Sequence, residues 1–157
     1  MHRIIALGLS LLVAATAFLS VSAGAAPRPE IISLPAKRGF DELVSTVEQA
    51  VEKHGLVRIA TASASRAAAA RGITIPGNAV VLAFNNPYAV RLLAASVPAG
   101  IEAPMRFYVT EAADGTSSLA YEKPSSVLAP YGDARLDELG SELDTLFAAI
   151  AQDAVGR

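Results

Sequence analysis

The stretch VVLAFNNPYAV, residues 80–90, sets a run of apolar residues directly against two asparagines, a proline and a tyrosine. Continuous apolar residues over 79–84 predict a β-strand that is covered on both faces. Asn86 followed by Pro87 predicts the start of a helix, with Asn86 as its cap and Pro87 at its first position. The stretch therefore predicts a buried strand that turns directly into a helix.

Apolar residues at helical or strand spacing predict the elements around this stretch. The expected helices span residues 40–55, 63–72, 87–96 and 133–152, and the expected strands span residues 56–60, 79–84, 103–111 and 117–123. Asp114-Gly115 is a strong hairpin signal, which places a β-hairpin near residues 104–122. Residues 26–39 read as an extended lead-in, with a short strand expected at 30–34.

These elements predict a single compact α+β domain. We expect a mixed β-sheet of about four to five strands with helices packed on it. The last predicted helix is amphipathic, because its leucines recur on one face. The domain is placed at residues 40–153.

The N-terminus has the pattern of an export signal. Arg3 precedes an apolar stretch from Ile4 to Leu19, and Ala23-Gly24-Ala25 is a small-residue cleavage motif. Residues 1–25 are therefore predicted to be a signal peptide cleaved near Ala25. A periplasmic or secreted location is expected for the mature protein. The alternative is an uncleaved membrane anchor, although the apolar stretch is shorter than the roughly 20 residues of a usual span.

Composition narrows the function classes. Removal of residues 1–25 from the 157 leaves 132 residues with 12 basic and 15 acidic side chains. That balance does not predict nucleic-acid binding, which needs a clustered basic surface, nor membrane binding after signal cleavage. The chain has no cysteine, so disulfides, thiolate metal sites and covalent haem attachment are excluded, and stability must come from packing.

Several turn and strand markers occur in an order known from one bacterial family. A helix ends in glycine before a strand, an apolar strand ends in Asn-Pro, and a proline heads the next strand before a hairpin. The corresponding positions are Gly55, Asn86-Pro87, Pro104, Asp114-Gly115, Tyr121 and Pro124.

In this order the markers resemble the family called domain of unknown function 302, over roughly residues 40–152. The resemblance implies a compact α+β domain that tends to form homodimers, and it implies no established activity. Asn85 stands where small residues such as glycine are common in that family.

The end of the predicted strand is the first candidate binding site. Free backbone N–H groups and the helix dipole at Asn85 and Asn86 favour an anion, and Arg91 and Arg106 can supply positive charge. The simpler interpretation is that Asn86 only caps the helix. Tyr108 and Tyr121 are expected to face each other across the hairpin, where Tyr121 can line a pocket.

We predict ligand-binding residues Asn85, Asn86, Arg106 and Tyr121 in a binding or accessory protein for a small ligand or a protein partner. Residues 124–132 are expected to form a flexible loop over such a pocket. No cofactor and no metal site is predicted.

A cofactor-independent enzyme with a pocket near Asn86 and Tyr121 is the alternative. It would need a group that titrates near neutral pH, and His54 is the only histidine after the signal. A third hypothesis is haem or metal binding through Met105, His54 or a tyrosinate.

Overall fold

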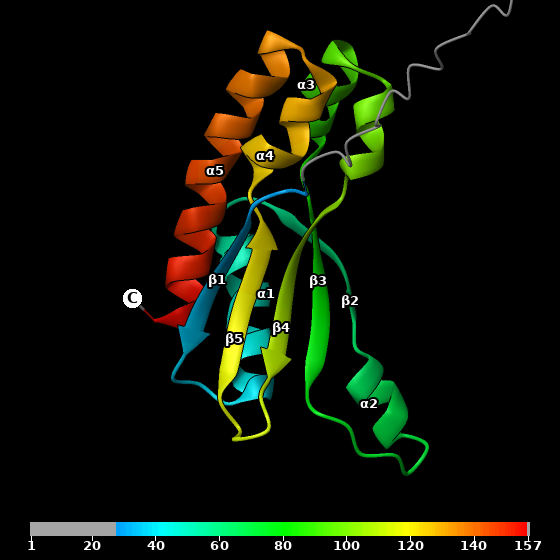
Figure 1. Cartoon of the computed structure of the whole chain (residues 1–157), viewed down its shortest axis with the longest axis vertical. Coiled ribbons are helices and arrows are strands. Elements are labelled where there is room, and N and C mark those ends of the chain that lie inside the picture. The colour runs from blue at the N-terminus through cyan, green and yellow to red at the C-terminus, as the bar shows by residue number, and fades with distance from the viewer. Residues whose placement is uncertain (1–27, 157) are drawn as a thin grey trace, which may run out of the picture.

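Five antiparallel strands and five α-helices make up the part of the chain that the computed structural model describes, residues 28–156 (Figure 1). The predicted signal peptide lies outside the described residues. In chain order the elements are β1 (Ile31–Ala36), α1 (Phe40–Lys53), β2 (Val57–Ala62), α2 (Ala64–Ala69), β3 (Asn78–Phe84), α3 (Asn86–Ala95), the 3-10 helix η1 (Pro98–Glu102), β4 (Met105–Glu111), β5 (Ser117–Glu122), α4 (Pro124–Leu128), the 3-10 helix η2 (Ala129–Tyr131) and α5 (Ala134–Val155).

The strand order in the sheet is β1-β5-β4-β3-β2. Helix α1 carries the chain from one edge strand, β1, to the other edge strand, β2, and the chain then returns strand by strand to β5 beside β1. The strand expected at 30–34 is therefore present as β1, which pairs with β5 along its length. The α+β fold class predicted from the sequence is confirmed.

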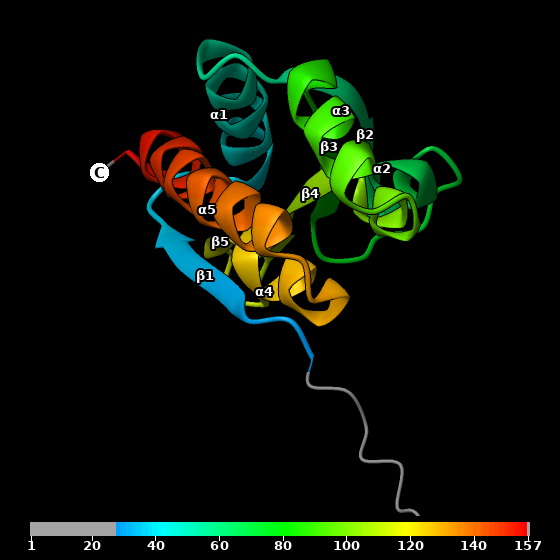
Figure 2. The ribbon, with the colours of Figure 1, turned by 90° about the horizontal axis from the view of Figure 1, so that it is seen from above.

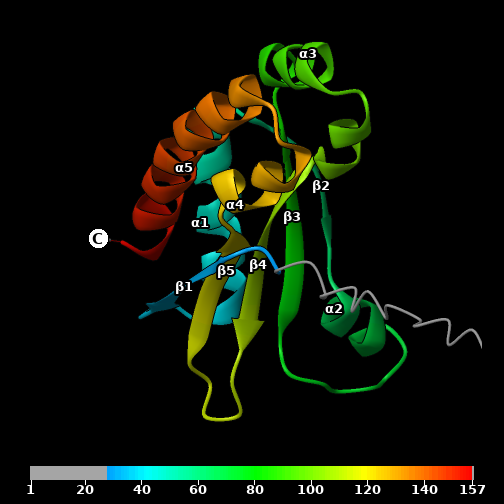
Figure 3. The same cartoon turned by 45° about the horizontal axis from the view of Figure 1, so that its top comes forward.

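Every pairing in the sheet is antiparallel, which corrects the expected mixed sheet. A parallel pair needs a helix that crosses the face of the sheet and returns to the starting end. Helices α2 and α3 instead stand at opposite ends of the sheet, so each connection re-enters beside the strand it left (Figure 3). The hairpin between β4 and β5 lies at residues 105–122, as its turn signal predicted.

One face of the sheet is covered by α1 and α5 (Figure 2). Both helices present apolar residues at helical spacing to the sheet, and Phe147 of α5 stacks on Phe107 of β4 with ring centroids 4.6 Å apart. Buried alanines such as Ala151 and Ala154 let α5 approach closely. This layer is the main hydrophobic core.

The other face of the sheet has no helix over it within the described residues (Figure 1). Burial alternates along β3, where Ala79, Val81 and Ala83 are buried while Val80 and Leu82 are only half-buried. The expectation that this strand is covered on both faces is therefore wrong. An antiparallel sheet can leave one face to solvent, but its outward residues are then usually polar, which these are not.

Residues 124–132 form α4 and η2, which corrects the expected flexible loop. Asp144 of α5 accepts hydrogen bonds from the Ser125 backbone N–H at 2.9 Å and from its hydroxyl at 2.6 Å. Leu128 is fully buried against α5 in a second, smaller apolar cluster. Within residues 28–156 no helix is both long enough and apolar enough to cross a membrane.

Candidate functional site

Asn85 caps helix α3, at the end of β3. Its backbone is extended, with φ −148° and ψ 123°, and its side-chain oxygen accepts a hydrogen bond from the Tyr88 N–H at 3.3 Å. The side-chain amide donates to the Gly55 carbonyl oxygen at 3.0 Å. Both ends of the Asn85 side chain are therefore used to hold β3, α3 and the turn after α1 together.

The prediction that Asn86 is the cap is wrong by one residue. Helix α3 begins at Asn86, and Pro87 occupies its second position rather than its first. Proline is tolerated there because N–H groups in the first helical turn have no acceptor within the helix. The side chain of Asn86 is left exposed to solvent.

Arg91 is already paired, which weakens the anion hypothesis at the strand end. Its guanidinium lies 2.7 Å from a carboxylate oxygen of Glu142 on α5 and 5.9 Å from the centre of the Tyr88 ring. The hydrogen bond from Arg91 lowers the pKa of Glu142. A free anion at the start of α3 would have to compete with this carboxylate.

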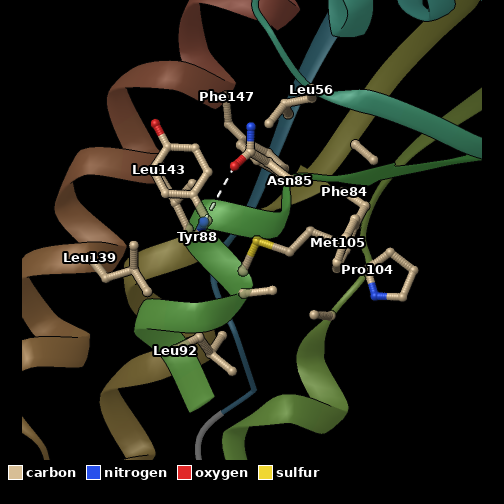
Figure 4. A pocket seen from close by; sticks show the side chains of 13 residues that line it. Leu56, Phe84, Asn85, Tyr88, Leu92, Pro104, Met105, Leu139, Leu143 and Phe147 are labelled. Carbon is tan, nitrogen blue, oxygen red and sulfur yellow. Dashed lines mark hydrogen bonds between the residues drawn. The ribbon is translucent and has the colours of Figure 1, made fainter. Parts of the chain in front are cut away.

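A small apolar cavity lies beside Asn85, where β3, α3, β4 and α5 meet (Figure 4). Its volume is about 40 Å³, room for only a few water molecules. Tyr88 and Met105 touch both apolar clusters, so the cavity lies on the boundary between them. It is lined by Leu56, Ala83, Phe84, Asn85, Tyr88, Ala89, Leu92, Ala103, Pro104, Met105, Leu139, Leu143 and Phe147. Sites for small molecules are usually larger, at roughly 300–1,000 Å³, so we interpret this cavity as a packing gap.

Arg106 and Tyr121 do not join Asn85 in one pocket. Arg106 lies on the open face of the sheet, where its guanidinium is 3.2 Å from a carboxylate oxygen of Glu122. Tyr121 is buried in the core, where its ring lies 5.6 Å from that of Phe107 and 5.7 Å from that of Phe147. Burial raises the pKa of Tyr121, so its hydroxyl stays protonated at neutral pH.

The expected pairing of Tyr108 with Tyr121 is also wrong. Tyr108 lies opposite Ala120, and Tyr121 lies opposite Phe107. Successive residues of a strand point to opposite faces, so this register sends one tyrosine to solvent and the other into the core. Turn signals in the sequence located the hairpin but not this register.

A shallow depression of about 320 Å³ lies on the open face of the sheet. Arg106, Tyr108 and Glu122 are among the residues that line it. Ile31, Val80, Ala120 and Tyr121 complete the lining. The sequence reasoning found Arg106 but missed Tyr108 as a surface residue, and the alternation of residues 106, 108 and 110 with the buried 107 and 109 was the available signal.

His54 caps the far end of α1 and pairs with α5. Its Nε2 lies 2.8 Å from an Asp153 carboxylate oxygen, which also accepts from Lys53 Nζ at 2.7 Å. These contacts, chiefly the one from Lys53, lower the pKa of Asp153. They hold the ends of α1 and α5 together, and Met105 lies in the cavity near Tyr88 rather than in this cluster (Figure 4).

Comparison with known proteins supports the fold and the resemblance. The family model described as Domain of unknown function DUF302 matches residues 32–153. The chain is similar to a crystal structure of an uncharacterized conserved protein DUF302 from Bacillus stearothermophilus, with a TM-score of 0.71 and 18% identity over 79% of this chain and 97% of that chain. No curated protein matches the sequence.

Proposed function

The chain belongs to the DUF302 family, and on that premise we propose that it is an exported binding protein that acts as a homodimer. The contact surface would be the open face of the sheet. The export part of the proposal is supported by the signal-like residues 1–25. A periplasmic or secreted location follows from the same residues.

The observation that carries the proposal is the apolar character of this uncovered face. Ile31 is 66% exposed and Tyr108 is 44% exposed, and Tyr108 lies opposite Ala120 of β5 on one side and Val80 of β3 on the other. Contiguous exposed apolar surface is uncommon on monomers and usually marks an interaction site. The half-buried residues Val80 and Leu82 of β3 fit a sheet whose second face is covered by another molecule.

The size of the face is close to the lower limit for a specific dimer. Five strands of six or seven residues cover about 24 Å by about 20 Å, or about 480 Å² per copy, from standard strand spacing and rise. Two copies would bury about 1,000 Å², which is the lower limit for a specific interface. Face-to-face packing of two sheets is a common way to build such a core.

Charge on the face is self-complementary. Arg106 and Glu122 are neighbours on adjacent strands, so a two-fold axis beside them brings each arginine near the glutamate of the second copy. The face therefore presents one positive and one negative side chain instead of a repulsive charge of one sign.

The edges of the sheet are poorer contact surfaces than its face. Pro35 lies in the edge strand β1, and the other edge strand, β2, has a register shift between Arg58 and Ala60. Prolines and bulges at sheet edges disfavour the addition of another strand. Contact through the face is therefore favoured over extension of the sheet.

A small ligand would bind between the two copies in this proposal. The depression of about 320 Å³ reaches the size of small-molecule sites but is open to solvent in one copy. A second copy over the face would enclose it, with Arg106 and Tyr108 as the polar contacts.

Sedimentation velocity of residues 26–157 tests the dimer. We expect a dimer at micromolar concentration and a monomer for Tyr108→Glu, because a carboxylate would be buried at the contact. Val90→Glu, at a similarly exposed apolar residue on α3, is the matched control and should stay dimeric. A wild-type protein that is monomeric at every concentration would contradict the proposal.

Native mass spectrometry of protein released gently from the periplasm tests the ligand. A dimer that carries a reproducible extra mass, lost in Arg106→Ala, supports a ligand on this face. A bare dimer would leave the face as an assembly surface only.

A further inference from the structure

Beyond the proposed dimer, we infer that the end of the domain formed by α3 and η1 contacts the lipid bilayer across which the chain is exported. Four exposed apolar side chains at this end, two on α3 and two at the start of and within η1, are called the ridge here. The ridge consists of Val90, Leu93, Val97 and Ile101, which are 57%, 46%, 74% and 83% exposed. Within residues 28–156, Val97 and Ile101 are the most exposed large apolar side chains.

Three of the four ridge residues, Leu93, Val97 and Ile101, lie in a stretch of sequence without charge. Residues 92–101, LLAASVPAGI, contain no ionisable side chain. On either side of it the charges are already engaged, since Arg91 pairs with Glu142 and Glu102 accepts a hydrogen bond from the Tyr131 hydroxyl at 2.8 Å. Exposed apolar side chains can enter the interfacial region of a membrane, and partners within the protein lower the cost of bringing the flanking polar groups close to it.

The ridge is a fixed surface of the fold. A Cβ on Gly100 would lie 2.8 Å from a methyl carbon of Leu93, so η1 packs directly against α3. At the far end of α3, Arg135 of α5 donates to the carbonyl oxygens of Ala94 and Ala95 at 3.1 and 3.0 Å. These contacts fix η1 against α3 and the end of α3 against α5.

The start of the described chain points to lipid as the occupant. Twenty-seven residues precede Arg28, and they include the apolar stretch Ile4–Leu19. Strand β1 begins at the end of the sheet where α3 and α4 stand (Figure 1). The Glu30 N–H donates to the Ser126 hydroxyl at 2.8 Å, which fixes the start of β1 against α4. An apolar segment held in a membrane would therefore bring this end of the domain, and the ridge with it, to the bilayer surface.

Four apolar side chains give weak membrane binding by themselves. Attachment through the preceding segment raises their local concentration at the bilayer, so the ridge can stay in contact although the free domain would bind weakly. The contact therefore belongs to the chain that still carries residues 1–25, whether before cleavage or as a retained anchor.

The absence of cysteine makes a direct test available, because one introduced thiol carries the only label. Full-length chain with Ile101→Cys or Val97→Cys is labelled with an environment-sensitive dye and reconstituted in phosphatidylethanolamine–phosphatidylglycerol vesicles. Ala113→Cys, in the exposed β4–β5 turn at the other end of the sheet, is the matched control. We expect a blue shift and severalfold quenching by nitroxide-labelled lipid at 97 and 101, and neither at 113.

Equal responses at 101 and 113 would overturn the inference. A response at 101 that needs no vesicles and grows with protein concentration would assign the ridge to a second copy, which also overturns it. The sedimentation behaviour of Tyr108→Glu is independent of both outcomes, so this inference and the proposed dimer can fail separately.

Discussion

The side-chain amide of Asn85 donates a hydrogen bond to the carbonyl oxygen of Gly55 at 3.0 Å, while its side-chain oxygen caps α3. One side chain therefore joins the end of β3, the start of α3 and the turn after α1. The sequence singled out both asparagines as ligand-binding residues, and the structure gives both the side-chain oxygen and the side-chain amide of Asn85 an internal partner.

We expect Asn85→Ala to lower the free energy of unfolding by about 1–2 kcal/mol, through loss of the cap and of the bond to Gly55. Asn86→Ala should change it by less than about 0.5 kcal/mol, because the Asn86 side chain is exposed. Urea unfolding of the two variants measures this difference. Equal losses would show that the cap assignment is incorrect.

Tyr121→Phe should leave stability and ligand uptake near the wild-type level. Its ring packs between Phe107 and Phe147, and phenylalanine keeps that packing. Tyr121→Ala should cost about 3–5 kcal/mol, as expected for removal of a core aromatic ring. Thermal unfolding and ligand binding are the two measurements. Loss of uptake in a stable Tyr121→Phe protein would restore Tyr121 as a binding residue.

Gly140→Ala should destabilise the contact between α4 and α5. A Cβ at this position would lie 2.7 Å from the Ser125 Cα, which is backbone and cannot rotate away. We expect a loss of about 1–3 kcal/mol in unfolding free energy from this overlap. Ser141→Ala, next along α5 and exposed, is the control and should be near neutral. A Gly140→Ala protein as stable as this control would indicate that α4 can shift freely.

Acid should weaken the link between α3 and α5 through Asp133. Hydrogen bonds from Arg135 lower the pKa of Asp133 from its ordinary 3.8 to about 2. Because the folded-state pKa is the lower one, the stabilisation is complete above about pH 4 and is lost as pH falls toward about 2.

The unfolding midpoint measured from neutral pH into this range should therefore fall less steeply for Asp133→Asn, which has already lost the contribution. Asp137→Asn, in the same first turn of α5, is the control and should keep the wild-type slope. Identical slopes for all three proteins would mean that the Asp133–Arg135 contact contributes no pH-dependent stability.

The local elements were predictable because their signals are local. The leucine spacing of α5 and the Asp114-Gly115 turn located that helix and the hairpin correctly. The family resemblance also followed from short markers in the right order, and the match over residues 32–153 confirms it. Each of these signals lies within a few residues of the feature it predicts.

The proposed site was harder to predict, because the sequence does not show which face of the sheet each strand residue occupies. Tyr108 and Tyr121 were expected to meet, but the register of β4 and β5 puts them on opposite sides of the sheet. Arg106 was placed near Asn85, but it points to the open face and pairs with Glu122. A shift of one residue in register reverses every such assignment, and no short-range signal fixes it.

By itself, the sequence determined that β3 is an apolar strand that ends in a capped helix, because apolar periodicity and asparagine capping act within one turn of chain. Only the tertiary structure decided that Asn85 is the cap, since the bond to Gly55 joins residues 30 positions apart. It also decided that Val80 and Leu82 face a side of the sheet that no helix covers within residues 28–156, because α1 and α5 both pack on the other side. Burial depends on where distant segments pack, so an apolar strand whose sequence predicts cover on both faces can still have one face open.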